Sequence, residues 1–277
     1  MHYRTMKKVG LISGMGELPK AIALDAKARG YHVVAVALDP LADRGLSDLV
    51  DEIRWINVGK LGAIIRYLKR AGVTKVVMAG KVPKSLLYEG KIIPDVKAIK
   101  LLFSLKDRRD DSILLAITGE LEKEGISLLD TTEFCAGLLA PQGILTKKGP
   151  SGSELKDISF GWRIAKEMGR LDIGQTVIVK NRAVMAIEAI EGTDEAIRRG
   201  GRLAGPGAVV VKAAKPHQDM RFDVPGAGTD TLRAMIEVHA AVLAVEAEKT
   251  ILIGKDRLIK EADQAGISLV GRKDDID

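Results

Sequence analysis

The sequence is poor in cysteine, which bears on the compartment in which the protein works and on whether it uses cysteine chemistry. Cys135 is the single cysteine among 277 residues, so no disulfide can form within the chain. A protein without disulfides suits a reducing compartment such as the cytosol. Cys135 lies in the apolar stretch 134–139, where a buried, inert thiol is expected in place of a nucleophile.

Aromatic residues are also scarce, at 4% of the chain. The core must therefore be built from Ala, Val, Ile and Leu, a composition that suits buried parallel strands flanked by helices. The net charge is +6, which indicates either a solvated basic surface or attraction to phosphate groups or an anionic membrane face. Nucleic-acid binding is not expected, because the basic residues are dispersed and few aromatic rings are available to stack on bases.

Further absences concern membranes and metals. No apolar run is long enough to span a bilayer, and residues 1–8 lack the apolar region of a signal peptide, so the protein is expected in the cytoplasm. A P-loop, a zinc-binding H-E-x-x-H helix and a G-x-S-x-G elbow are all missing. The four histidines, at positions 2, 32, 217 and 239, lack the spacing of metal ligands. A hard, oxygen-liganded cation is thus favoured over a transition metal.

The first half of the sequence alternates short apolar runs with helical patterns. Strands are predicted at 9–13, 31–38, 53–58, 75–79 and 126–129, and helices at 19–29, at 61–71 and over most of 83–124. Strands that alternate with helices are typical of a doubly wound parallel sheet. We therefore predict an α/β fold whose N-terminal, Rossmann-like domain covers residues 1–142.

The second half has a different pattern. Turn-forming residues concentrate at 143–153, and the domain boundary is predicted there. Strands are predicted at 175–179, 184–187, 208–213, 251–253 and 268–270, and helices at 153–169, 193–199, 229–237 and 257–265. The spacing between the first two of these strands suits a hairpin. Residues 143–277 are predicted to form a mixed α/β domain with at least one antiparallel pair, and a ligand cleft is expected between the domains.

A glycine turn, Gly14-Met15-Gly16, follows the first predicted strand. Glycines at this place let backbone N–H groups approach an anion at a helix N-terminus. The dinucleotide-binding fingerprint is incomplete, because Pro19 stands where its third glycine belongs. A tight turn without a ligand is the alternative. Lys81 follows the fourth predicted strand, at the edge where open α/β sheets bind ligands, and is interpreted either as a phosphate contact or as an ordinary exposed lysine.

Three carboxylates follow the strand predicted at 184–187, namely Glu188, Glu191 and Asp194. Acidic groups gathered at the end of a strand are what an oxygen-liganded hard cation requires. Helix capping combined with surface charge is the other explanation. The position at a strand end favours a functional role.

The densest polar segment covers residues 212–228. If its residues 219–224 are extended, Asp219, Arg221 and Asp223 share one face of the strand and the apolar residues between them share the other. One interpretation is a ladder of charges that satisfy each other. The favoured interpretation is a site that holds Mg²⁺ and clamps a phosphate, since further cations and a glycine turn lie on either side.

Four stretches together resemble one known family: Gly10–Pro19, Asp172–Val179, Glu188–Asp194 and Gln218–Pro225. It is the family of UDP-2,3-diacylglucosamine pyrophosphatases of lipid A synthesis that lack the His-rich metallophosphoesterase motifs. The resemblance extends over nearly the whole chain and is most specific in the two acidic C-terminal stretches. It implies a two-domain, Mg²⁺-dependent enzyme that holds its substrate between the domains and releases UMP and 2,3-diacylglucosamine 1-phosphate. The family's essential aspartate matches Asp223.

The residue patterns and this resemblance together give the polar residues expected roles. Catalysis is expected from Asp223, Asp219 and Arg221. Mg²⁺, or Mn²⁺ in its place, is expected on Asp223, Glu188, Glu191 and Asp194. Substrate contacts are expected from a third set of residues: Gly14, Met15, Gly16, Lys81, Thr193, Lys212, Lys215 and Gln218. The acyl chains of such a substrate stay partly in the bilayer, so transient docking on the cytoplasmic leaflet is also expected.

Two rival functions are kept open. A nicotinamide-dependent oxidoreductase would use Gly14, Gly16 and Asp39, which lies at a suitable distance for a ribose contact, but it would leave the acidic motifs unused. A non-catalytic nucleotide-sugar-binding protein would use the same cleft without turnover. The number of subunits is open as well, with a homodimer as one option.

Overall fold

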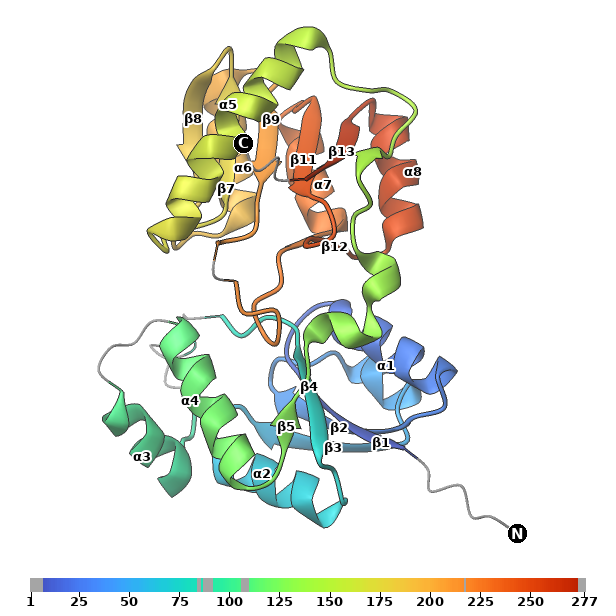
Figure 1. The fold of residues 1–277 in the computed structure, drawn as a ribbon, viewed down its shortest axis with the longest axis vertical. Coiled ribbons are helices and arrows are strands. Elements are labelled where there is room, and N and C mark those ends of the chain that lie inside the picture. Colours follow the sequence, from blue (N-terminus) through green and yellow to red (C-terminus); the bar gives the residue numbers. More distant parts are fainter. Residues whose placement is uncertain (1–6, 84–85, 87–91, 106–109, 217, 274–277) are drawn as a thin grey trace. The chain divides into compact units, whose positions relative to one another are not determined.

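A computed structural model describes residues 7–83, 86, 92–105, 110–216 and 218–273 of the chain. The chain divides into two compact units (Figure 1). The first unit consists of Met1–Cys135 together with Met220–Phe222, and the second consists of Ala136–Asp219 and Asp223–Asp277. The expected two-domain α/β organisation is confirmed.

The boundary lies earlier than predicted. The first unit ends at Cys135, whereas the sequence places the boundary after residue 142. Strand β6 (Gly143–Ile144) pairs antiparallel with β13 (Ser268–Arg272). The turn-rich stretch is therefore already part of the second unit, because its backbone is used at a sheet edge.

The first unit contains a five-stranded, fully parallel sheet of strand order β3-β2-β1-β4-β5. Its strands are β1 (Lys8–Ser13), β2 (His32–Asp39), β3 (Glu52–Asn57), β4 (Lys75–Ala79) and β5 (Ser127–Leu128). The runs of β1 and β2 are almost continuously apolar and buried, because helices cover both faces of the sheet. This arrangement confirms the predicted doubly wound, Rossmann-like domain.

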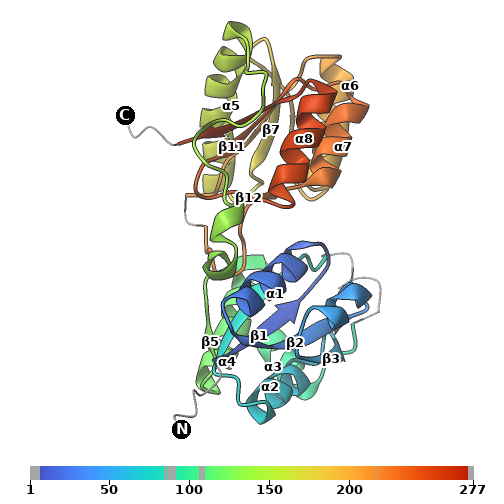
Figure 2. The ribbon, with the colours of Figure 1, turned by 90° about the vertical axis from the view of Figure 1, so that its right-hand side faces the viewer.

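Helices lie on both faces of this sheet (Figures 1 and 2). They are α1 (Leu18–Ala28), α2 (Leu61–Arg70), α3 (Val96–Ser104) and α4 (Asp110–Lys123). One core joins Val34 and Val36 of β2 with Leu68 of α2, and residues of α3 and α4 extend it. Helix α1 packs on β1 and β2 with its buried Ile22 and Ala26, which do not belong to that core.

The second unit contains a six-stranded mixed sheet of order β6-β13-β11-β9-β7-β8. Its other strands are β7 (Thr176–Lys180), β8 (Ala183–Ile187), β9 (Val209–Lys212) and β11 (Val242–Glu246), and β10 (Gly226–Ala227) pairs separately with β12 (Ile251–Leu252). Strands β9, β11 and β13 are parallel, and β7 is antiparallel to both β9 and β8.

The predicted hairpin between β7 and β8 is confirmed. Asn181 and Arg182 adopt left-handed φ angles of 53° and 57° at its turn, the conformation that suits a two-residue hairpin loop. The buried Asp157 carboxylate accepts hydrogen bonds from both of their amides, at 2.9 and 2.6 Å. Helix α5 (Gly152–Arg170), which carries Asp157, thereby fixes the hairpin.

Helix α5 covers one face of the six-stranded sheet, and α6 (Thr193–Ala204), α7 (Thr229–Glu237) and α8 (Lys255–Ala265) cover the other (Figure 2). The two cores agree with this division: Trp162 of α5 packs with one set of strand residues, and Ile197 and Met235 pack with the other. None of the helices in the described ranges is both long and apolar enough to cross a membrane.

Candidate active site

In the first unit, the glycine turn after β1 is held against the turn after β4. Met15 and Lys81 each donate their amide to the other's carbonyl oxygen at 2.9 Å, and the Gly14 amide donates to the Ala79 carbonyl at 2.8 Å. A Cβ on Gly14 would lie 2.6 Å from the Lys81 carbonyl oxygen, so the close approach requires glycine. The tight turn therefore has a structural cause. Substrate binding by Gly14, Met15, Gly16 and Lys81 stays a prediction, and the amides of Gly14 and Met15 are already engaged.

The first unit also includes Met220–Phe222, whose backbone is held by Thr131. The Thr131 amide donates to the Met220 carbonyl at 2.9 Å. The Thr131 hydroxyl lies 3.0 Å from the Arg221 carbonyl and 3.1 Å from the Met78 carbonyl, and the residue is only 2% exposed. Phe222 packs against the core of this unit. Thr131 is not among the predicted site residues, because no local pattern links it to a segment 90 positions away.

The segment from Asp219 to Val224 is a turn, so the predicted strand is wrong. The Asp223 amide donates to the Asp219 carbonyl at 3.0 Å, which reverses the chain direction. The alternation of polar and apolar residues has another cause: Phe222 enters the core of the first unit, and the side chain of Arg221 lies 3.7 Å from Glu122. Asp219, Arg221 and Asp223 therefore do not share one face of a strand.

In the second unit, Asp223 belongs to a group of charges at the end of β9. The Lys215 ammonium lies 3.4 Å from the Asp223 carboxylate and 2.7 Å from the Asp172 carboxylate. Gln218 accepts from the Lys215 amide at 2.8 Å and donates to the Asp223 carbonyl. The structure thus brings together Lys215, Gln218 and Asp223, three of the predicted site residues.

Asp172 completes this group and is absent from the predicted set. It follows helix α5 with a left-handed φ of 55°, a conformation that Asp tolerates better than most residues. Its side chain is 35% exposed and holds Lys215 beside Asp223. A signal was present in the sequence, since Asp172 begins one of the stretches that carry the family resemblance.

A second polar group lies where β8 and β9 end. The Lys212 ammonium donates to the Thr193 hydroxyl at 2.7 Å, and that hydroxyl donates to the Glu188 carboxylate at 2.8 Å. Lys212 is 4% exposed. The other oxygen of Glu188, Oε2, is buried and lacks a hydrogen-bond partner within the described structure. A buried carboxylate oxygen in this state is suited to a cation or to a donor from a ligand.

The remaining predicted metal ligands point to other partners. Glu191 lies 2.5 Å from the Arg199 guanidinium, which holds the pKa of that carboxyl below its usual value. Asp194 accepts from the Thr231 hydroxyl at 3.2 Å. Across the described part of the chain, no three His, Cys, Asp or Glu side chains converge on one point. The predicted four-carboxylate set is therefore not assembled here.

Cys135 behaves as the sequence predicts. It is 3% exposed, and burial, assisted by the charge of Asp25, raises the pKa of its thiol to about 12. The thiol is therefore protonated at neutral pH, and it donates to the Thr131 carbonyl at 3.1 Å. A nucleophilic role is inconsistent with this environment.

Comparison with known proteins gives matches over both units. The model of the LpxI N-terminal domain matches residues 8–138, and the model of the LpxI C-terminal domain matches residues 141–270. The chain is 32% identical over 277 residues to a protein of Caulobacter vibrioides named UDP-2,3-diacylglucosamine pyrophosphatase LpxI, covering 96% of this chain and 98% of that protein.

Solved structures give weaker likenesses. An epimerase-like protein from Bacteroides thetaiotaomicron is 20% identical with a TM-score of 0.27, covering 44% of each chain. The UDP-glucose 4-epimerase of Thermus thermophilus is 15% identical with a TM-score of 0.28, covering 52% of this chain and 41% of that one. Scores this low carry no conclusion about fold or chemistry.

Proposed function

The chain belongs to the LpxI family, and on that premise we propose that it is a hydrolase that cleaves the pyrophosphate of UDP-2,3-diacylglucosamine in lipid A biosynthesis. The products are UMP and 2,3-diacylglucosamine 1-phosphate. The observation that carries this proposal is the match of both family domains, in order, over residues 8–138 and 141–270. The charged groups around Lys212 and Asp223 have the chemistry that a phosphoanhydride requires.

The cations of the second unit are proposed to offset the charge of the pyrophosphate. Lys212 is buried, so its ammonium acts in an environment where charge interactions are stronger than in water. Lys215 is held by Asp172 at 2.7 Å, which fixes its position. These two residues, together with the backbone that Gln218 orders, would bind the phosphates and stabilise the charge that develops on the leaving group.

The carboxylates are proposed to hold a divalent cation and to orient water. Glu188 fits a cation because its buried Oε2 lacks a partner among the described residues, and Asp223 supplies a second oxygen donor. Glu191 and Asp194 fit less well, since each already has a protein partner. Mg²⁺ or Mn²⁺ bound there would polarise phosphoryl oxygens. Asp223 is proposed to orient the attacking water.

The location of the substrate gives the proposed location of the enzyme. A diacylated sugar keeps its acyl chains in a lipid phase, so the protein is proposed to work in the cytoplasm with transient contact to the inner leaflet of the membrane. The substrate contact, not the fold, supports this part of the proposal.

The decisive experiment is turnover of the named substrate. Purified protein is incubated with UDP-2,3-diacylglucosamine in detergent micelles with Mg²⁺, and UMP is measured. Asp223→Asn is expected to lower kcat by more than 100-fold. Mutating a residue that only supports a metal ligand typically lowers activity roughly 10- to 100-fold, and losing a group that itself contacts the metal or the water should cost more. Asp230→Asn is the control, since its side chain is 80% exposed in the same unit.

Three results would separate the alternatives. Release of UMP by the native chain and by Asp230→Asn, but not by Asp223→Asn, supports the proposal. Tight binding of the substrate by the native chain without any UMP would favour the nucleotide-sugar-binding protein. Consumption of a nicotinamide cofactor in place of UMP release would favour the oxidoreductase.

A further inference from the structure

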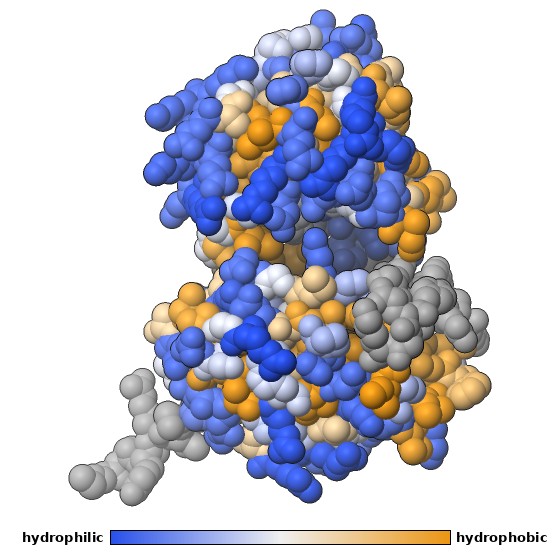
Figure 3. Space-filling model, turned by 180° about the vertical axis from the view of Figure 1, so that it is seen from behind, coloured by the Kyte–Doolittle hydropathy of each residue, from blue (hydrophilic) through white to orange (hydrophobic). Residues whose placement is uncertain are grey.

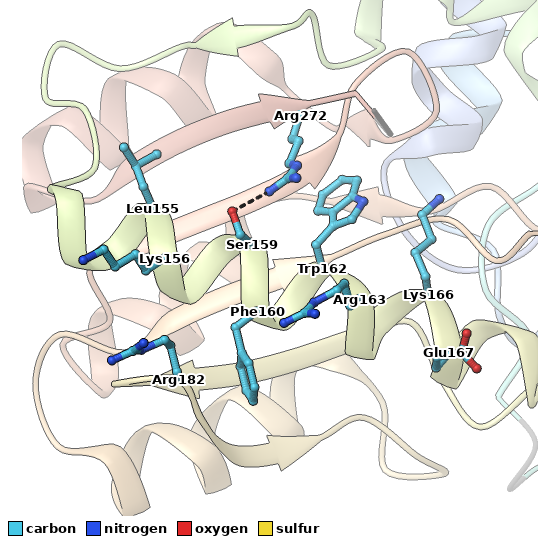
Figure 4. A pocket seen from close by; sticks show the side chains of 10 residues that line it. All are labelled: Leu155, Lys156, Ser159, Phe160, Trp162, Arg163, Lys166, Glu167, Arg182 and Arg272. Carbon is cyan, nitrogen blue, oxygen red and sulfur yellow. Dashed lines mark hydrogen bonds between the residues drawn. The ribbon is translucent and has the colours of Figure 1, made fainter. Parts of the chain in front are cut away.

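One face of the six-stranded sheet is covered less completely than the other. Of the described helices, α5 is the one that packs on it, and a helix about 10 Å wide spans only two or three strands at about 4.8 Å each. A groove of about 900 Å³ follows α5 as a result. Figure 4 shows that its side chains come from α5, from the hairpin turn on one side of the helix and from β13 on the other.

The groove is strongly basic. Five of its ten lining residues are cations: Lys156, Arg163, Lys166, Arg182 and Arg272. Among those ten, all in the described part of the chain, Glu167 is the one carboxylate, and it already binds Arg170 at 2.9 Å. The balance of charge along this groove therefore favours an anionic partner.

The opposite face of the same unit shows that this basic groove is not an ordinary polar surface. Figure 3 shows hydrophilic side chains there too, over α6, α7 and α8. Two of its arginines are matched by acids: Arg198 lies within 2.7 Å of both Glu195 and Glu237, and Arg257 lies 2.7 Å from Glu261. The two faces are similarly polar, but on the α5 face the cations outnumber the acids: Lys166 is paired with Glu246 at 2.8 Å, and the groove is lined by four further cations and one further carboxylate.

Two features of the groove indicate the chemical class of its partner. Leu155 is 50% exposed beside the cations, which suits contact with lipid more than contact with a nucleic acid. Trp162, the groove's largest ring, is 4% exposed and lies beneath the Arg272 guanidinium at 5.2 Å, so it is not available to stack on a base. The groove is open and extends along both sides of a helix. This shape fits contact with many lipid headgroups better than the binding of a single small ligand.

We propose that the α5 face, meaning α5 with Arg182 and Arg272, is the surface by which this protein docks on an anionic phospholipid membrane. The inference rests on the proposed function, because a diacylated substrate must be collected from a lipid surface. Lys and Arg side chains near an anionic leaflet are attracted to its negative surface potential, and their aliphatic stems can lie along apolar surface while the charged ends reach the headgroups.

The docking face is connected to the candidate active site through a buried carboxylate. Glu246, which is 1% exposed, lies 2.8 Å from the Lys166 ammonium of the groove. The same carboxylate accepts from the Ala214 amide at 2.7 Å, and Ala214 directly precedes Lys215. A membrane docked on α5 would therefore be linked, through Glu246, to the segment that carries the proposed phosphate-binding residues Lys212 and Lys215.

The test is sedimentation of the full chain with vesicles. Vesicles of phosphatidylcholine alone are compared with vesicles in which roughly a third of the lipid is phosphatidylglycerol, because an anionic leaflet attracts Lys and Arg side chains. The double variant Lys156→Gln/Arg163→Gln removes two exposed cations from helix positions where glutamine is well tolerated. Binding to the anionic vesicles is expected to fall about 30-fold, since each cation near such a surface contributes about fivefold. Raising the salt concentration should weaken binding of the native chain.

The matched control removes two exposed cations from the opposite face, as Arg202→Gln/Lys260→Gln. Its vesicle binding is expected to stay within about twofold of the native chain if the effect is local to α5. Equal losses in both double variants, or no preference of the native chain for anionic vesicles, would overturn the proposal. Tighter binding to a DNA duplex than to the vesicles would also overturn it.

UMP release from micellar substrate is measured on the same preparations. The α5 variant is expected to keep native kcat in micelles, because Lys156 and Arg163 lie outside the candidate active site. Loss of vesicle binding with intact micellar turnover supports the docking face. If the native chain binds anionic vesicles in a charge-dependent way but releases no UMP, the proposed function is wrong and the docking surface is still supported.

Discussion

Replacing Thr131 with valine tests whether the first unit holds the turn that leads to Asp223. The substitution keeps the branched shape and removes one hydroxyl, which lies 3.0 and 3.1 Å from the Arg221 and Met78 carbonyls. Thr131 is 2% exposed, so water cannot replace the lost donor. Leaving a buried acceptor without its partner costs about 1–3 kcal/mol.

The expected change in stability is large enough to measure. For a unit of this size, 1 kcal/mol shifts the melting temperature by roughly 4 °C, so the first unit should melt about 4 to 12 °C lower. Circular dichroism or scanning calorimetry on the full chain would report this shift. The neighbouring Thr132→Val variant is the control, because it makes the same replacement at a less buried position.

Activity should fall along with stability, for a separate reason. The Arg221 carbonyl that Thr131 holds lies two positions before Asp223, within the turn closed by the Asp223 amide and the Asp219 carbonyl. Loosening this turn should lower kcat about tenfold, which corresponds to about 1.4 kcal/mol of lost positioning, and should change KM little. A Thr131→Val protein that melts lower but keeps native kcat would refute the link between this contact and the site. Native melting together with native kcat would refute the whole argument.

Three further predictions concern the site and the thiol. Asp172→Asn keeps the left-handed backbone but removes the ion pair with Lys215. We expect kcat to fall about tenfold and the free energy of unfolding to change by at most about 1 kcal/mol. If the variant fails to fold, Asp172 has a role in stability and not in positioning Lys215. EDTA should abolish UMP release and Mg²⁺ or Mn²⁺ should restore it, whereas full activity in chelator would argue against an oxygen-liganded cation. Cys135 should resist iodoacetamide at pH 8 in the native chain and react after unfolding, because a pKa of about 12 leaves almost no thiolate; rapid native alkylation would contradict its burial.

Local patterns predicted most of the secondary structure. Strand β4 (Lys75–Ala79) and helix α7 (Thr229–Glu237) have their predicted bounds, and a glycine marks one end of each, Gly80 after β4 and Gly228 before α7. Strand β11 (Val242–Glu246) was missed, although it lies between β13 and β9 in the second sheet. Every residue of β11 is buried, and a short apolar run cannot be told from a buried helix segment by periodicity alone. Strand β9 is equally buried, but Gly205, Pro206 and Gly207 mark its start, whereas β11 directly follows two alanines.

The sequence by itself determined the α/β class, the division into a doubly wound unit and a mixed unit, and the family, because each of these depends on residue order and spacing along the chain. It also pointed to Asp223, Lys215 and Gln218, which the structure brings together. The tertiary structure decided which carboxylates have partners: Arg199 and Thr231 bind Glu191 and Asp194, while one oxygen of Glu188 lacks a partner among the described residues.

Only the tertiary structure assigned Met220–Phe222 to the first unit and made residues 219–224 a turn. An alternating pattern of six residues fits a half-buried strand, and it fits equally well a turn that inserts one aromatic ring into a core. The choice depends on what Phe222 contacts and on a hydrogen bond from Thr131, 90 positions earlier in the chain. Contacts between residues so far apart in the sequence produce no periodic pattern in it. They depend on which segments the fold brings together, whereas periodicity reflects only the spacing of neighbouring residues.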